Sequence, residues 1–496
     1  MKTLHRTYSK LILVCVFSGL TITGCKKDFL EVSPQGSLTD ALFPKTSADA
    51  LLATNAIYAQ TRVWEFHSGG FPILDIISDD TRKGSNPGDG GRITLYDNFT
   101  FSATASDIFP WYAALFQAVK SSNVVIEYVP EIDMDDALRN RYIAEARCLR
   151  AFFYFNLVRT FGGVPKVITV HPDYNLPRSS ASEIYNDVII PDLQYAAAQL
   201  PEKSQYGQSD AGRVTRGTAK ALLAKVYLYL GNYAQAESYA LEVINSSQYS
   251  LEANYSDAFL PIGQNGVESI FEVGALAFET TTNGGNQHGN TQGVRGNPNR
   301  GWGFNRPTLD LINNYEEGDI RKDASVIFLN EVLDGILIEG DNSTLDTTWT
   351  DASHTQILEI ECYNQKVWVP GTQTIEQWGY NIKEMRYADL LLIAAEAMNE
   401  AGHGADGLQY LNAVRTRAGL EEIIETGQSA LRDIIMNERR TELAMESNRF
   451  YDLVRTGRAA SVLGPLGFVS GKHELFPIPQ NEIDLSGGSL NQNPGW

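Results

Sequence analysis

Cys25 has the sequence context in which a bacterial cysteine thiol becomes attached to lipid. It directly follows residues 22–24 (Ile-Thr-Gly) and an apolar run from Leu11 to Leu20, and basic residues precede that run. An apolar run of about ten residues is too short to span a bilayer, which needs about 20. We therefore predict that residues 1–24 are a lipoprotein signal peptide and that Cys25 is acylated, which makes a lasting membrane anchor. Ordinary secretion with a chance cysteine is the alternative.

Asp79 and Asp80, followed by Arg82, are the carboxylates whose spacing could support chemistry. Two carboxylates can cleave a glycosidic bond or bind Ca²⁺. Adjacent residues of a strand point to opposite faces, so the pair could act together only in a loop. The sequence also has no Gly-x-Ser-x-Gly, His-Glu-x-x-His or Gly-rich phosphate motif,. We expect a protein that is not an enzyme, without catalytic residues, metal site or cofactor, and structural calcium stays an open alternative.

Two further groups of polar residues invite a catalytic interpretation. Charged residues cluster between Glu438 and Arg449, where Arg439 could pair with Glu442, and Glu446 with Arg449, along one helix,. We interpret this cluster as structural. The histidines at positions 67, 288 and 354 stand singly in polar loops, so we expect solvated side chains.

The elements that must position such residues are mostly helical. Apolar residues recur at spacings of three and four, which predicts the following elements. The expected helices are Ala48–Gln60, Trp111–Tyr128 and Leu138–Phe161, the expected helical hairpins are 217–244 and Tyr387–Val414, and Ser269–Val273 is an expected strand. The hairpins have small residues at tetratricopeptide-like offsets, which indicates a curved helical scaffold. We interpret the aromatic residues 152–155 as core.

Composition limits the partners and the organisation of the chain. Its 496 residues contain no long linker, so one composite domain is expected after a tether at residues 25–40,. Removal of residues 1–24 moves the formal charge from −20 to −23, because three basic and no acidic residues are lost. This charge disfavours nucleic acid as a partner. Cys148 and Cys362 are expected to be buried free thiols, with a disulfide as the alternative,.

Short motifs along nearly the whole chain carry a family resemblance. They are Gly24-Cys25, Ala144–Arg147, Gly162–Pro165, Arg216–Ala219, Arg386–Leu391, Asn412–Arg415, Glu438–Arg440, Arg449–Leu453, Phe476–Pro479 and Gln492–Gly495. Their order resembles the SusD/RagB family of outer-membrane nutrient-binding lipoproteins. Each motif is weak alone, but together they span residues 24 to 495.

The resemblance implies a mainly α fold. Tetratricopeptide-like hairpins, four in the family, would form a curved scaffold, with a loop-rich irregular lobe and a few short strands. The body would be residues 41–496, with ligand-binding loops inserted at roughly 62–101 and 275–380. The resemblance also implies a cell-surface protein of the outer membrane that captures oligosaccharide and delivers it to a SusC-like TonB-dependent barrel. A binding protein for peptide or another non-sugar nutrient, and a structural envelope lipoprotein, remain alternatives.

An oligosaccharide binder needs aromatic rings that stack on sugar faces and polar groups that bind hydroxyls. The two long loops contain both kinds of residue, and the segment before Lys383 adds one more tryptophan. The candidate ligand residues are Trp302, Phe304, Trp64, Tyr96, Asp79, Arg82, Asn299 and Trp378. Trp302 is the strongest, because the flanking Gly301 and Gly303 leave its indole little local packing. The alternative is that Trp302 fills a gap beneath its loop.

Overall fold

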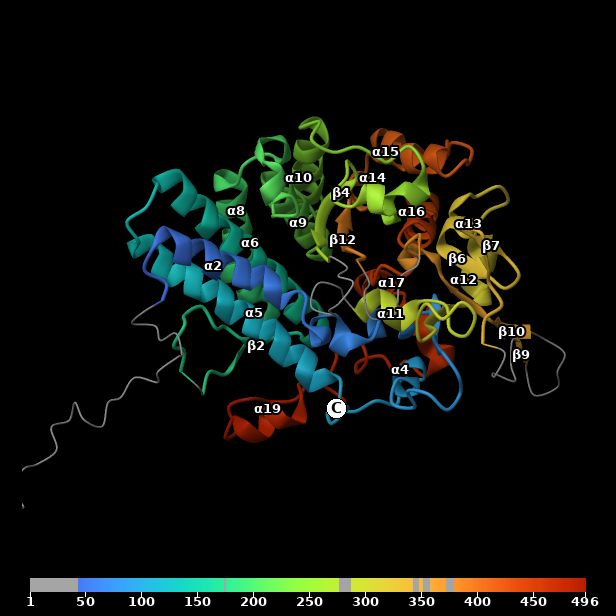
Figure 1. Cartoon of the computed structure of the whole chain (residues 1–496), viewed down its shortest axis with the longest axis horizontal. Helices are drawn as coiled ribbons and strands as arrows, with labels where there is room; N and C mark the ends of the chain where they lie inside the picture. Colours follow the sequence, from blue (N-terminus) through green and yellow to red (C-terminus); the bar gives the residue numbers. More distant parts are fainter. Residues whose placement is uncertain (1–42, 174, 276–286, 342–347, 351–356, 372–378) are drawn as a thin grey trace, which may run out of the picture.

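Helices dominate the part of the chain that the structure describes, and the strands are short (Figure 1). The computed structural model describes residues 43–173, 175–275, 287–341, 348–350, 357–371 and 379–496. The helices are α2 (Ser47–Gln60), α3 (Ile73–Ile76), α4 (Thr94–Asp97), α5 (Ile108–Tyr128), α6 (Asp136–Phe161), α7 (Ala181–Ile184), α8 (Ile190–Gln199), α9 (Arg216–Tyr229), α10 (Tyr233–Asn245), α11 (Gln287–Gln292), α12 (Leu309–Asn314), α13 (Arg321–Ser325), α14 (Tyr387–Glu400), α15 (Gly404–Arg417), α16 (Gln428–Glu442), α17 (Arg449–Arg455), α18 (Ala459–Leu463) and α19 (Gln480–Leu485). The prediction of a mainly helical fold is confirmed.

The strands pair two by two, and every pair is antiparallel. They are β1 (Thr81–Gly84), β2 (Val164–Pro165), β3 (Arg178–Ser179), β4 (Ser269–Val273), β5 (Phe304–Pro307), β6 (Val326–Phe328), β7 (Val332–Leu333), β8 (Ile336–Leu337), β9 (Thr348–Thr350), β10 (Ile357–Ile360), β11 (Cys362–Asn364) and β12 (Ile382–Arg386). The β1–β5 pair aligns Thr81 with Pro307 and Gly84 with Phe304. This pairing joins the two long loop regions, which are distant in sequence.

The long helix α6 shows how local sequence sets the scaffold. The Asp135 side chain accepts a hydrogen bond from the Leu138 amide at the start of the helix, and Gly162 ends it at φ +72°,. Phe153 and Tyr154 are fully buried, so the aromatic run of α6 is core as predicted. Helix α5 packs along α6 and supports the segment that follows α2.

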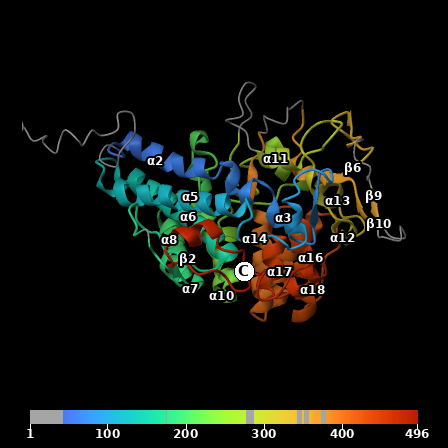
Figure 2. The same cartoon turned by 90° about the horizontal axis from the view of Figure 1, so that it is seen from below.

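Helical hairpins form the scaffold predicted from the small residues. Helices α9 and α10 form one hairpin and α14 and α15 another, and α10 packs on α14 (Figure 1). A Cβ on Gly407 of α15 would lie 3.1 Å from the Ala395 Cα of α14, so the backbones are close. Figure 2 shows that α11 lies on the opposite face of the molecule from α10 and α18.

Much of the polar segment 287–305 is buried, although residues 296, 297 and 299 are exposed. Gln292 and Asn305 are fully buried. The Asn305 Nδ2 donates to Gln292 Oε1 at 2.7 Å, and the Asn364 Nδ2 donates to the same oxygen at 2.8 Å. These amides satisfy one another, so the polar segment can be buried.

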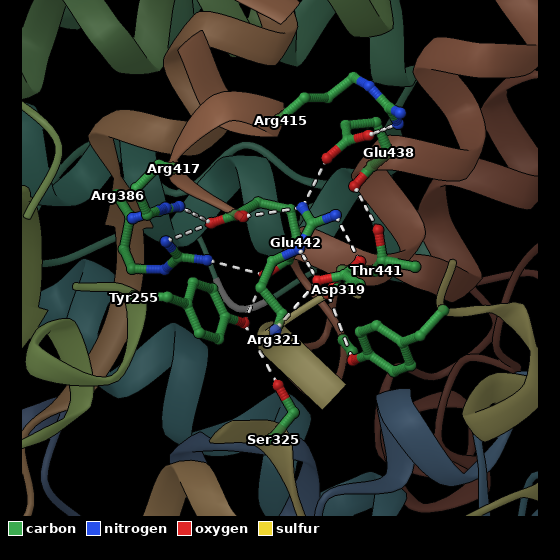
Figure 3. Close-up of polar contacts among 12 residues, drawn as sticks. Tyr255, Asp319, Arg321, Ser325, Arg386, Arg415, Arg417, Glu438, Thr441 and Glu442 are labelled. Atoms are coloured by element: carbon green, nitrogen blue, oxygen red, sulfur yellow. Dashed lines mark hydrogen bonds and ion pairs between the residues drawn. The ribbon is translucent and has the colours of Figure 1, made fainter. Parts of the chain in front are cut away.

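The charged cluster around α16 is structural, but its predicted partners are wrong. Glu442 is fully buried and contacts Arg321, Arg386 and Arg417 at 3.1, 2.8 and 2.6 Å (Figure 3). The pairs within three residues do not form, because both arginines have other partners. Arg439 contacts Asp389 and Asp452. Arg449 contacts Asp79. Glu446 instead contacts Arg386 and Lys366.

The cysteines and the N-terminal segment were also subjects of sequence predictions. Cys148 and Cys362 are buried thiols that form no disulfide, so the disulfide alternative is wrong. Within the described residues, no helix is long and apolar enough to cross a membrane. Residues 1–24, Cys25 and the tether at residues 25–40 lie outside the described part, so those predictions stay predictions.

Candidate aromatic binding site

Four aromatic residues from the two long loops form one cluster, which we call the aromatic platform: Trp64, Phe71, Trp302 and Phe304. The ring centroids of Trp64 and Trp302 are 5.9 Å apart. Phe71 lies 5.6 Å from Trp64, 6.3 Å from Trp302 and 5.0 Å from Phe304. The structure therefore brings together three of the predicted ligand residues, Trp64, Trp302 and Phe304, and adds Phe71.

Two layers can be distinguished within the platform. Phe71 and Phe304 are 6 % and 5 % exposed, whereas Trp64 and Trp302 are only partly buried. The two indoles are therefore the part that a ligand can touch, and the two phenylalanines support them. Partly exposed indoles held on a rigid base suit stacking on an apolar face.

Glycines hold both indoles in place. The Trp64 indole lies directly against Gly70, where an added Cβ would be 2.0 Å from its Nε1. The backbone of Trp302 donates to the Asn290 carbonyl of α11 at 2.8 Å. The neighbouring Gly301 lies so close to that carbonyl that an added Cβ would be 2.6 Å away. The flanking glycine thus serves close packing of the backbone rather than freedom of the indole.

Arg92 lies at the rim of the platform, and no sequence motif marks it as a ligand residue. Its guanidinium carbon is 4.8 Å from the Phe71 ring centroid, and its Nε donates to Asp107 Oδ1 at 2.9 Å. The Arg92 side chain is 44 % exposed, while that of Asp107 is 4 % exposed. A buried carboxylate therefore fixes an exposed cation beside the indoles, where it can donate hydrogen bonds to a ligand.

A polar cavity of about 60 Å³ lies beside the loop that carries Trp64. His67, three residues after Trp64, is part of its lining. Its polar lining includes His67, His288, Glu384, Asn156 and Arg159. The two imidazole centroids are 5.7 Å apart, and His67 Nδ1 is 3.6 Å from Glu384 Oε1. The expectation of solvated histidines is therefore wrong for His67 and His288, and His354 lies outside the described residues.

Burial controls the charge in this cavity. It lowers the pKa of His67 to about 4 and that of His288 to about 3, so both imidazoles are neutral at pH 7,. Burial also raises the pKa of Glu384 to about 7, against the opposing charges of Arg159 and Lys225. The cavity therefore offers two neutral imidazoles and a weakly acidic carboxyl group beside the cationic Arg159.

The other predicted ligand residues are not members of the aromatic platform. Tyr96 is fully buried against Phe101, so we withdraw it as a ligand residue. The Arg82 guanidinium donates to the Ser78 and Thr81 carbonyls, which directs it to its own loop. Asn299 is exposed. Trp378 lies outside the described residues.

The Asp79–Asp80 pair is engaged in ion pairs. Arg449 donates to both oxygens of Asp79 at 2.8 Å, and Arg440 Nε donates to Asp80 at 2.7 Å. Asp79 is 8 % exposed, so the prediction that it contacts a ligand is wrong. This pairing opposes both the glycosidase and the calcium interpretations of the two carboxylates. Among the described residues, no group of three or more His, Cys, Asp or Glu side chains is placed to hold a metal ion.

Comparison with known proteins places this geometry in a family. A model of the SusD family matches residues 267–467, and a model described as "starch-binding associating with outer membrane" matches residues 28–228. A solved structure of a laminarin-binding SusD-like protein is 30 % identical, covers 91 % of this chain and 100 % of its own, and has a TM-score of 0.77. The chain belongs to the SusD family.

Two further SusD-family relatives show the same breadth of match. SusD-like protein P2 of Formosa agariphila is 29 % identical over 96 % of this chain and 98 % of its own. Surface glycan-binding protein A of Bacteroides thetaiotaomicron, solved in complex with laminarihexaose, is 26 % identical. That structure covers 90 % of this chain and 100 % of its own, with a TM-score of 0.77.

Proposed function

We propose that this SusD-family protein binds an oligosaccharide on the aromatic platform. The observation that carries the proposal is the meeting of Trp64 and Trp302, from two distant loops, as partly exposed indoles 5.9 Å apart. Indole faces stack on the apolar C–H faces of sugar rings, while Arg92 and the polar cavity beside His67 supply hydrogen-bonding groups,. Binding without hydrolysis fits the Asp79–Asp80 pair, because Arg449 and Arg440 form ion pairs with the two carboxylates.

The first ligand to test is a laminarin-type glucan. Two of the similar solved structures are described as binding laminarin or laminarihexaose. We propose the same class for this chain, since both indoles and the rim cation are available for a neutral glucan.

The decisive experiment is calorimetric titration of laminarihexaose into the protein and into Trp302→Ala. Loss of one stacking ring should weaken binding by about tenfold or more, which corresponds to about 1.4 kcal/mol. The melting temperature should change little, because the Trp302 indole is partly exposed. Tyr239→Ala is a matched control, since Tyr239 and Tyr227 form a second partly buried aromatic pair, 5.8 Å apart, on the helical scaffold.

The outcomes separate the alternatives. Unchanged affinity in folded Trp302→Ala would remove the platform from the site. A loss of roughly 3–5 kcal/mol of folding stability would instead identify Trp302 as a gap-filling residue. Binding of peptides but not of glucans by the unmodified protein would favour a peptide-binding function.

We further propose that the protein is anchored in the outer membrane by acylated Cys25, faces the cell exterior and delivers its ligand to a SusC-like TonB-dependent barrel. Support comes from the signal sequence, the outer-membrane description of the matching family model and the similarity to SusD of Bacteroides thetaiotaomicron. Cys25→Ala should move the folded protein from the membrane to the soluble fraction. Retention of that variant in membranes of cells without the barrel would contradict the lipid anchor.

A further inference from the structure

A second cavity, of about 230 Å³, shares no residue with the aromatic platform. It lies between the start of α5, the segment after β2 and helix α19. Figure 1 shows α19 beside the green segment that follows β2. Phe116, Pro165, Val167 and Leu490 form much of its wall. Leu485, at the rim, is 80 % exposed. The cavity is thus apolar and open to solvent at one edge.

Three polar groups of this cavity have no internal partner. Tyr112 is 2 % exposed, and neither its hydroxyl nor the Ser489 Oγ has a hydrogen-bond partner among the described residues. The Glu482 carboxylate, on α19, likewise forms no hydrogen bond or ion pair within the described part of the chain. Glu482 is partly buried, and this burial raises the pKa of its carboxyl group,. Unsatisfied buried polar groups require a structural explanation.

Arg178, whose charge acts on Tyr112, does not supply the missing charge. Arg178 donates to the carbonyls of Phe161, Gly163 and Asn491 and to Asn493 Oδ1, so its donors are already used. The residues that line the cavity include Glu482 and Asp173 but no lysine, arginine or histidine. Anions are therefore disfavoured, whereas a cation would be stabilised.

The aromatic walls favour the same charge. Tyr112 and Phe116 form a pair with centroids 4.8 Å apart, and both line the cavity. Aromatic faces attract ammonium groups, most strongly where water is displaced. Small-molecule sites are typically apolar, with a few polar groups that orient the ligand. We propose that this cavity binds a small organic ammonium ion, with its charge at Glu482 and its apolar part against the walls.

An ordered water could satisfy the Tyr112 hydroxyl but would leave two features unexplained. Water brings no counter-charge to Glu482 and gains nothing from the apolar walls. An organic ammonium ion satisfies the carboxylate, the aromatic pair and the apolar surface together. The cavity is independent of the aromatic platform, so this proposal does not depend on glucan binding.

Choline is a suitable probe because a neutral molecule of the same shape exists, 3,3-dimethylbutan-1-ol. Titration of the full mature chain, followed by ligand-observed NMR, should show one saturable site for choline. The neutral analogue should bind at least about tenfold more weakly, because the carboxylate and the aromatic faces act on the charge. Equal binding of both probes, or no saturable choline binding at millimolar concentration, would overturn the proposal.

Two substitutions locate the site. Glu482→Gln keeps the side-chain shape, removes the charge and should weaken choline binding by about tenfold. Asp484→Asn is the matched control, because Asp484 is exposed on the same helix and does not line the cavity. Ala113→Leu narrows the cavity and should also abolish binding. If Glu482→Gln bound choline as well as the unmodified protein, or if Asp484→Asn lost as much affinity, the assignment would be wrong.

Discussion

Glu442 and Glu384 are two buried carboxyl groups that the fold treats in opposite ways. Burial opposes ionisation of Glu442, yet Arg417, Arg386 and Arg321 hold its pKa well below the ordinary value. Glu384, in the cavity beside the platform, has no arginine within ion-pair distance among the described residues, and burial raises its pKa to about 7. Its side chain remains 15 % exposed.

The difference separates a structural region from a region available for binding. In the Glu442 region, charges of both signs neutralise one another, and Arg321, Arg386 and Arg417 each form an ion pair with Glu442 (Figure 3). Near the platform, the two indoles, Arg92 and Glu384 are partly exposed. Buried ion networks are therefore poor indicators of a functional site, and partly satisfied groups beside exposed aromatics are better ones.

The largest expected effect is on the Glu442 region. Glu442→Gln removes a charge that three buried guanidinium groups share, and the arginines then lack compensation. We expect a loss of about 3–5 kcal/mol in the free energy of unfolding, measured by chemical denaturation. Glu422→Gln is the control, because Glu422 is exposed.

The comparison also predicts how glucan affinity responds to Glu442→Gln. Molecules of the variant that remain folded should bind laminarihexaose with nearly unchanged affinity, since Glu442 does not line the platform or the cavity beside it. A large loss of affinity at unchanged stability would break the division between the two regions.

A smaller effect is expected at the contact between α14 and α15. Ala395 is 1 % exposed, and Gly407 of α15 lies directly against its backbone. Ala395→Trp should overpack this contact, cost about 1–3 kcal/mol of stability and lower the melting temperature. Ala430→Trp on the exposed side of α16 is the control. Lost glucan binding with an unchanged melting temperature would show that this hairpin is not merely scaffold.

The helices could be predicted from the sequence because their signals are local. Asp135, Gly162 and the apolar spacing between them define α6 to within two residues of its predicted start,. Trp302 and Trp64 were identified as candidates from their aromatic character in polar, glycine-rich surroundings. Their contact could not be predicted, because it depends on the pairing of β1 with β5 across the long intervening sequence.

Residues whose role depends on distant partners were the ones misassigned. Asp79 has a carboxylate that could bind a ligand, but Arg449 donates hydrogen bonds to both of its oxygens. Arg92 has no local motif and gains its position from Phe71 and Asp107. A single sequence contains no signal for such long-range pairing, because the partner of a charged side chain is set by the tertiary fold.

The smallest expected effect concerns pH and Glu384. Its pKa in the folded protein, about 7, exceeds the ordinary value of 4.5, so between these values the folded state holds a proton that the unfolded state has lost. The free energy of unfolding must then fall as pH rises from about 5 to 8. Glu384→Gln should remove this contribution, on the order of 1 kcal/mol, and stabilise the protein at pH 8 relative to the unmodified chain. The Glu442 region behaves oppositely, since a carboxyl group with a lowered pKa stabilises the fold above its ordinary pKa and loses that contribution in acid,.

Chemical denaturation of the unmodified protein and of Glu384→Gln, each at pH 5 and pH 8, measures the contribution of Glu384. If the unmodified protein and Glu384→Gln showed the same pH dependence, Glu384 would be ionised at neutral pH, and the proposed contrast between the two buried carboxyls would fail.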